Sequence, residues 1–236
     1  MKIVPLVLLL CCAAAEPQGT QPVLVELFTS QGCSSCPPAD ELLSRIARDP
    51  ALRGRVIPLA YHVDYWDHLG WRDPFSSREW SLRQGEYVRA MRLASSYTPQ
   101  VVVNGARQMV GSSSSQVYRA IDDESRRAPE GSVSVRVDGG DVVVRASAPR
   151  AGAELMVVTF EDGATTNVLR GENSGRTIAN DAIVRSLQRV ATLDGKHDVE
   201  QRVKLSPGPR IGVAAFLQDT KTKRIWTAAT TVAAFP

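Results

Sequence analysis

Two cysteines separated by two residues are the part of this chain best suited to chemistry. Cys33 and Cys36 follow an apolar run at 23–28. Pro37 and Pro38 come next, and proline suits the first turn of a helix, where its missing N–H costs no hydrogen bond. The free amides and partial positive charge of a helix N-terminus favour thiolate over thiol. The spacing therefore predicts a reversible disulfide, with Cys33 attacking and Cys36 resolving.

Other interpretations of these residue types stay open. A structural disulfide across so short a loop contributes little stability through chain entropy. Two cysteines alone are too few ligands for a structural zinc site. Copper or zinc could also draw on four nearby side chains of ligand type, whose irregular spacing is more typical of hydrogen bonds and caps. We therefore expect no metal site and no bound cofactor; the four are His62, Asp64, Asp67 and His68.

The N-terminus has the pattern of a secretory signal peptide at residues 1–15. Lys2 supplies the positive charge, residues 3–12 are apolar but too short to span a bilayer, and three alanines offer a cleavage site. Lipidation of Cys11 or Cys12 is the competing interpretation. Cleavage leaves two of four cysteines in a compartment that permits disulfides. We expect a periplasmic or secreted protein without stable membrane insertion after cleavage.

The first part of the mature chain alternates strands and helices. Val23 to Phe28 and Val56 to Val63 are apolar, β-branched runs typical of buried strands. Pro37 to Arg48 has helical apolar spacing, and as a crossover it makes a βαβ unit. The segments expected after this unit are an aromatic loop at 64–75, a helical segment at 76–95, strands at 101–103 and 108–110 joined by an Asn-Gly turn, and a helix ending near 127.

From residue 132 the pattern changes to short alternating strands. A Pro-Glu-Gly connector at 129–131 separates the two patterns. Seven or eight strands in about 105 residues are typical of a β-sandwich. We therefore predict an α/β domain at 22–128 followed by an all-β sandwich domain at 132–236. The expected strands lie at 133–137, 142–146, 155–160, 167–170, 183–193, 199–205, 211–217 and 226–232.

The cysteine pair, its βαβ unit and Tyr97-Thr98-Pro99 together resemble the thioredoxin superfamily. The resemblance implies a thioredoxin-like α/β domain in which Pro99 is cis and faces the cysteines, while the Thr98 backbone contacts substrate. Glu26 is similar to the buried acid that many thioredoxins carry before their motif, which implies help in deprotonating the second cysteine. The residues alone leave open whether Glu26 accepts a proton or pairs with an Arg or Lys.

The aromatic loop after the second strand also has two interpretations. Tyr65 and Trp66, with Trp71 and Phe75, either line a substrate groove beside the cysteines or form a local hydrophobic cluster. The first is possible because the strand ending at Val63 finishes on the cysteine side of the sheet. Tyr65 and Trp66 therefore join Thr98 and Pro99 as candidate substrate-binding residues.

Longer motifs are spread over nearly the whole mature chain. They are Glu26 to Asp40, His62 to Asp67, Trp71, Asp73 to Phe75, Thr98 to Gln100 and Gly171 to Asn173. Together they resemble a family of secreted bacterial proteins catalogued as domain of unknown function 1223, and the resemblance implies fold and compartment but no substrate. By residue type, Gly171 to Asn173 with Asp181 is a plain turn rather than a calcium loop.

These observations favour an exported thiol–disulfide oxidoreductase. Its partners would be thiol- or disulfide-bearing proteins or small thiols. The net charge is only +3 and no long run of Lys or Arg occurs, so composition gives no reason to expect nucleic acid as a partner. The alternatives are a non-catalytic binding or chaperone module with a structural disulfide, and a copper- or zinc-handling protein.

Overall fold

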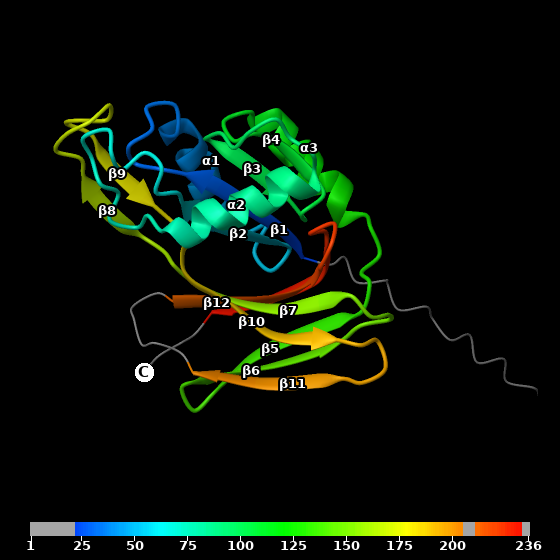
Figure 1. Cartoon of the computed structure of the whole chain (residues 1–236). Helices are drawn as coiled ribbons and strands as arrows, with labels where there is room; N and C mark the ends of the chain where they lie inside the picture. The colour runs from blue at the N-terminus through cyan, green and yellow to red at the C-terminus, as the bar shows by residue number, and fades with distance from the viewer. Residues whose placement is uncertain (1–21, 205–210, 233–236) are drawn as a thin grey trace, which may run out of the picture.

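The computed structural model describes residues 22–204 and 211–232, which form three helices and thirteen strands (Figure 1). The helices are α1 (Pro37–Arg48), α2 (Arg78–Ala90) and α3 (Ser114–Ser125). The strands are β1 (Val23–Thr29), β2 (Val56–His62), β3 (Gln100–Val103), β4 (Arg107–Val110), β5 (Ser132–Asp138), β6 (Asp141–Ser147), β7 (Ala153–Glu161), β8 (Ala164–Asn167), β9 (Thr177–Asn180), β10 (Ile183–Leu193), β11 (Val199–Lys204), β12 (Ile211–Asp219) and β13 (Ile225–Val232).

Eight strands form one mixed sheet in the order β13-β12-β7-β10-β2-β1-β3-β4. β1 and β2 are parallel and joined by α1, and β10 lies parallel to the other edge of β2. The remaining pairs in this sheet are antiparallel. A three-stranded sheet, β11-β6-β5, and the β8-β9 hairpin complete the described strands.

Helices cover both faces of the sheet at β1, where every residue is buried. Leu27 of β1 and Ala39 of α1 both pack around Gly111. The next strand residue, Phe28, instead meets the Tyr87 ring of α2, with ring centroids 6.1 Å apart. Because consecutive strand residues point to opposite faces, α1 and α2 lie on opposite sides of the sheet. β1 is therefore apolar apart from Glu26 and Thr29, and it ends at the start of the cysteine loop.

Strand β7 serves two hydrophobic cores. Met156 and Val158 belong to the core shared with the helices. Leu155 and Val157, on the other face, pack in a second core with Val144 of β6. The three-stranded sheet thus covers one face of the eight-stranded sheet, below the helical part in the view of Figure 1.

The predicted thioredoxin-like α/β domain followed by an all-β sandwich is wrong. The described chain is mostly β, with 44% strand and 18% helix, and strands from both sides of the connector at 129–131 enter one sheet. They meet where Ile183 of β10 pairs with Ala60 of β2 and the Ala60 N–H donates to Ala182 O at 2.7 Å. The physical reason is that β2 would otherwise leave an unpaired edge, which β10 covers.

The signal peptide expected at residues 1–15, with Cys11 and Cys12, lies outside the described residues. Within the described ranges, no helix is both long and apolar enough to cross a bilayer.

Candidate functional site

The cysteine pair lies between the end of β1 and the start of α1. Cys33 and Cys36 form the expected disulfide, with Cα atoms 5.5 Å apart. Cys36 is the N-cap of α1, and Pro37 and Pro38 occupy its first turn, so two of the usual unpaired amides are absent. Both cysteines have 0% exposed surface, whereas the two serines between them are exposed. The disulfide is therefore covered, although the loop that carries it is at the surface.

Two hydroxyl groups lie against the sulfur of Cys33. Thr98 Oγ1 donates to Cys33 Sγ at 3.3 Å, and Ser35 Oγ lies at the same distance. Trp66 Nε1 in turn donates to Thr98 Oγ1 at 2.8 Å, which leaves the Thr98 hydroxyl hydrogen for the sulfur. Hydrogen bonds to a sulfur favour its thiolate. Cys33 is thus the cysteine whose surroundings suit a negative charge.

The four candidate substrate residues meet around the Thr98 side chain. The Thr98–Pro99 peptide bond is cis, as expected, and Trp66 reaches Thr98 beside the disulfide. Tyr65 donates its hydroxyl to Gln84 Oε1 of α2 at 3.1 Å. Burial raises the pKa of Tyr65 to about 12, against the opposing hydrogen bonds of Gln84 and Thr98. The Tyr65 hydroxyl therefore lies between α2 and Thr98.

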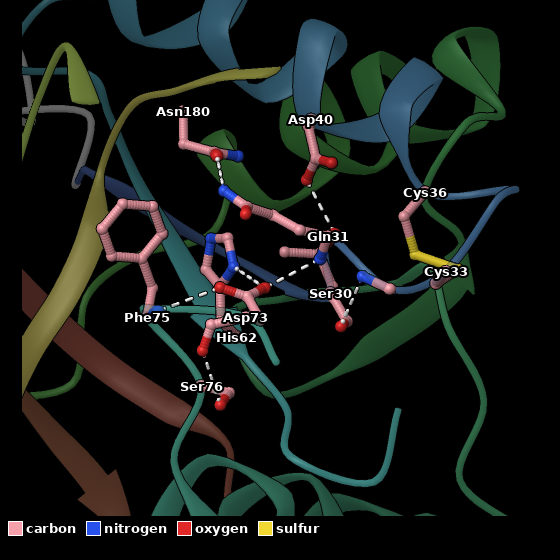
Figure 2. Close-up of polar contacts among 12 residues, drawn as sticks. Ser30, Gln31, Cys33, Cys36, Asp40, His62, Asp73, Phe75, Ser76 and Asn180 are labelled. Carbon is pink, nitrogen blue, oxygen red and sulfur yellow. Dashed lines mark hydrogen bonds and ion pairs between the residues drawn. A yellow bond between two sulfur atoms is a disulfide. The ribbon is translucent and has the colours of Figure 1, made fainter. Parts of the chain in front are cut away.

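A buried ion pair underlies the loop that leads to Cys33 (Figure 2). Asp73 Oδ2 lies 2.7 Å from His62 Nδ1 and accepts the backbone N–H of Gln31 at 2.7 Å. Burial opposes charge on both groups, but their attraction outweighs it, so the pKa of His62 is raised and the pKa of Asp73 is lowered. Gln31 Nε2 also donates to Asn180 Oδ1 at 3.0 Å. The pair thereby fixes the backbone two residues before Cys33.

Asp40 is buried one helical turn after Cys36. Thr29 Oγ1 donates to Asp40 Oδ1 at 2.7 Å. Burial raises the pKa of Asp40 to about 7, against the opposing effects of His62 and of the Thr29 hydrogen bond. This carboxyl group is therefore partly protonated near neutral pH.

Glu26 belongs to a different cluster, on the α2 face of the sheet. Arg83 binds Glu26 Oε1 through Nε at 2.7 Å and Nη2 at 2.6 Å, and the Tyr87 hydroxyl donates to Oε2. Gln218 of β12 donates to the Tyr87 hydroxyl at 3.1 Å. Of the two interpretations left open for Glu26, the ion pair is the one found. Both carboxylate oxygens are engaged in holding β1, α2 and β12 together.

Two side chains from the loop at 168–176, between β8 and β9, complete the site. Asn173 Nδ2 donates to the carbonyl oxygen of Cys33 and to that of the residue two positions earlier, each at 2.9 Å. The Ser34 N–H donates to Glu172 Oε2 at 3.0 Å. Asn173 is buried with 1% exposed surface. This loop therefore holds the cysteine loop in place, although the two are about 140 positions apart in sequence.

Gly171 lets this loop approach closely. Its φ is +76°, and an added Cβ would lie 3.0 Å from Cβ of Trp71. The tripeptide Gly171-Glu172-Asn173, expected to be a plain turn, thus contacts the cysteine loop. Its only sequence signal was its place among the motifs of the family resemblance, because local pattern does not reveal a partner 140 positions away.

The side chains considered as metal ligands are otherwise engaged or exposed. Asp67 Oδ2 accepts the Ser76 hydroxyl at 2.6 Å, and Asp64 Oδ1 accepts the Ser81 hydroxyl at 2.5 Å. His68 is exposed. Within residues 22–204 and 211–232, no group of three or more His, Cys, Asp or Glu side chains is arranged to hold a metal ion.

A groove of about 910 Å³ runs along α1, between this helix and β9. It begins at Pro37, next to Cys36, and its walls include Asp40, Tyr118 and Ile178. The groove therefore brings solvent close to the end of α1 that carries the disulfide.

The sequence matches the model of the family described as "Protein of unknown function (DUF1223)" over residues 24–218. No curated protein matches the chain significantly. The structure is similar to a crystal structure of a protein from Agrobacterium tumefaciens, with 29% identity and a TM-score of 0.77 over 94% of this chain and 98% of that one. It is also similar to HBP35 of Porphyromonas gingivalis, with 14% identity and a TM-score of 0.61 over 94% of this chain and 82% of that one, a likeness of fold alone.

Proposed function

Because this chain belongs to the DUF1223 family, whose description gives no activity, we propose its function from the site itself: thiol–disulfide exchange at Cys33 and Cys36. The observation that carries the proposal is the pair of hydroxyls, from Thr98 and Ser35, at 3.3 Å from Cys33 Sγ. A purely structural disulfide has no need of groups that stabilise a thiolate.

The exchange balances as two displacements. In the reduced protein the Cys33 thiolate attacks a substrate disulfide, the substrate S–S bond breaks, and one substrate sulfur leaves as a thiolate and takes a proton. Cys36 then loses its proton and attacks the mixed disulfide, which releases the second substrate thiol and forms the Cys33–Cys36 bond. The substrate gains two electrons and the protein loses two. In the reverse direction a disulfide is delivered to the substrate.

Access to the sulfur requires movement, because both cysteines are fully covered. Trp66 and Thr98 on one side and the loop at 168–176 on the other are the neighbours that a substrate must displace or join. The partners we propose are thiol- or disulfide-bearing proteins or small thiols, met outside the cytoplasm after removal of the leader. We assign no proton transfer to Glu26, whose carboxylate is held by Arg83 and Tyr87.

The same burial favours a second candidate, a binding module with a structural disulfide. The two functions differ in reduction potential, since structural disulfides in secreted proteins have potentials below about −300 mV and reactive ones lie higher. Equilibrating the purified protein with dithiothreitol mixtures, and counting thiols by alkylation and mass, separates them. A potential below that limit, together with no reduction of a disulfide-bonded test protein, would refute the exchange function.

Replacing Thr98 with Val tests the carrying observation. The reduced variant should show a higher pKa at Cys33 and about tenfold slower alkylation near neutral pH, because a hydrogen bond to a charged group contributes about 1.5 kcal/mol. Thr165→Val is the matched control, since it removes an exposed hydroxyl on β8. Equal alkylation rates in the two variants would show that the Thr98 contact has no part in thiolate stabilisation.

A further inference from the structure

The carboxylate of Glu172 bonds the amide next to Cys33. The Ser34 N–H donates to Glu172 Oε2 at 3.0 Å across 138 positions of sequence. Glu172 is exposed, whereas Asn173 beside it is buried and bonds Cys33 O at 2.9 Å. The buried amide therefore fixes the place at which the exposed carboxylate meets the cysteine loop.

This carboxylate acts against a negative charge on Cys33. Ser34, through its side chain and its backbone amide, lowers the pKa of Glu172, so that Glu172 is ionised near neutral pH. A fixed negative charge beside a cysteine disfavours its thiolate. An amide already bonded to a carboxylate is also no longer free to stabilise a thiolate. The hydroxyls of Thr98 and Ser35 act in the opposite direction.

We propose that Glu172 restrains the cysteine pair by opposing the Cys33 thiolate, and thereby stabilises the disulfide over the dithiol. This role rests on the proposed exchange function. Reduction by a dithiol begins when its thiolate attacks Cys33 Sγ, and the S–S bond breaks with Cys36 leaving as a thiolate that takes a proton. The second thiol of the reductant then displaces Cys33, so the reductant loses two electrons. Glu172 raises the free energy of the charge that Cys33 now carries.

Other charged groups lie around the cysteine loop, and the substitutions used in the test leave them unchanged. The His62–Asp73 pair is beneath the loop, bonded to its backbone through the Gln31 amide. Asp40 lies one helical turn after Cys36. A change confined to Glu172 therefore reports on that carboxylate alone.

The test compares Glu172→Gln with Glu200→Gln. Glutamine keeps an acceptor for the Ser34 amide and removes the charge. Glu200 is an exposed acid of β11, so the control makes the same change in net charge on the three-stranded sheet. Alkylation rates of reduced protein against pH give the pKa of Cys33, and equilibration with dithiothreitol gives the ratio of disulfide to dithiol.

Glu172→Gln should lower the pKa of Cys33 and raise its ratio of thiolate to thiol about threefold, the size typical of exposed charge interactions. At a pH above the pKa of Cys33, where the thiolate is the main reduced form, the redox equilibrium should move toward the dithiol by the same factor, which is about 14 mV at 29.6 mV per tenfold. Both differences should shrink near 1 M salt, because salt screens exposed charges. Glu200→Gln should leave Cys33 unchanged.

Equal values for the two variants, or a difference that high salt does not reduce, would overturn the role of Glu172. Both measurements concern the protein alone. A salt-sensitive shift without any exchange on a disulfide-bonded test protein would defeat the proposed function and leave the effect of Glu172 on Cys33 standing. Normal exchange on the test protein, with no shift in the pKa of Cys33 or in the redox equilibrium, would defeat the role of Glu172 and leave the proposed function standing.

Discussion

Cys33 Sγ is surrounded by groups that act on its charge in opposite directions. The Thr98 hydroxyl stabilises a thiolate, and the Glu172 carboxylate on the neighbouring amide opposes one. The two residues between the cysteines do not set this balance by themselves, because reduction potential depends on hydrogen bonds and charge around the sulfur. We therefore expect the chemistry of this pair to depend on Ser35 together with residues far from it in sequence.

Asp40 makes a separate prediction about stability and pH. Its pKa is about 7 in the folded protein, against an ordinary value of 3.8, so the folded state binds more protons than the unfolded state between these values. The free energy of unfolding must then fall as pH rises from about 4 to 7, by about 4 kcal/mol from this group. Asp40→Asn cannot titrate, so its free energy of unfolding should not fall in this way. The variant should therefore gain stability relative to the wild type as pH rises across that range. Urea unfolding at one-unit pH steps measures it.

The neighbouring Glu41 provides the control. It is exposed and lies in the same turn of α1, so Glu41→Gln should retain the wild-type dependence on pH. If the free energy of unfolding of Asp40→Asn has the same pH dependence as that of the wild type, the carboxyl group is not protonated in the folded state. Other interactions must then offset the effect of burial on its pKa.

Glu26 and Asp40 also show how much of the site residue types alone can predict. The sequence pointed to Glu26 because it precedes the cysteines on a buried strand, and a buried carboxylate was found there. Its partner Arg83 is 57 positions away, and no local pattern assigns that pairing. Asp40 looked like an ordinary acid in the first turn of a helix. Its burial depends on Thr29 and on the sheet behind it, which appear only in the folded chain.

At the scale of elements, local signals were sufficient for helix α1 and for the Asn-Gly turn, but not for every strand. Helix α1 spans the predicted Pro37–Arg48, because prolines fix its start and apolar residues follow the helical period. Asn104 and Gly105 adopt φ of +48° and +59°, as their turn chemistry predicts. The segment expected to be a strand at 167–170 is mostly loop, since β8 ends at Asn167. That loop is shaped by its contact with the cysteine loop rather than by strand pairing.

The loop at 168–176 gives a prediction at this scale. Asn173→Ala removes two hydrogen bonds to the cysteine loop and should lower the free energy of unfolding by about 1–3 kcal/mol, because buried carbonyl groups lose their partners. The disulfide should also be reduced faster by dithiothreitol, since its cover is loosened. Urea unfolding measures the change in stability. Time courses of reduction by dithiothreitol, quenched at intervals, measure the change in rate.

Ser174→Ala is the matched control for that variant. Ser174 is exposed and its hydroxyl bonds Leu169 O within the same loop at 3.2 Å. The control should change neither stability nor reduction rate by a comparable amount. Similar behaviour of the two variants would mean that the loop does not hold the cysteines through Asn173.

At the scale of the whole molecule, sequence patterns found most strands but not their neighbours. A strand pattern says which face is buried, and not which strand lies alongside. The joining of β10 to β2 rests on pairing between Ile183 and Ala60, 123 positions apart by their numbers. No sequence pattern near either residue predicts this pairing. The change of pattern at 129–131 is real, yet it falls within one continuous sheet.

A truncated chain tests this continuity. Residues 22–128 alone would leave the β2 edge unpaired and would bury Glu26 and Arg83 without Gln218 of β12. We therefore expect no cooperative unfolding transition in this fragment, and aggregation through the open edge. Circular dichroism during urea titration, with the full mature chain as control, measures it. A fragment that unfolds cooperatively would show that its helices and four strands suffice as a domain.

The order in which the chain is synthesised gives the 140-residue distance between Cys33 and Asn173 a further meaning. A ribosome completes the cysteine motif long before it reaches the loop that holds it, and before β10 exists to close the sheet. An unfinished chain therefore carries both thiols with neither the buried amide nor the carboxylate beside them. Since chains fold from the N-terminus as they emerge, the sulfur atoms acquire their final surroundings only when the C-terminal strands arrive.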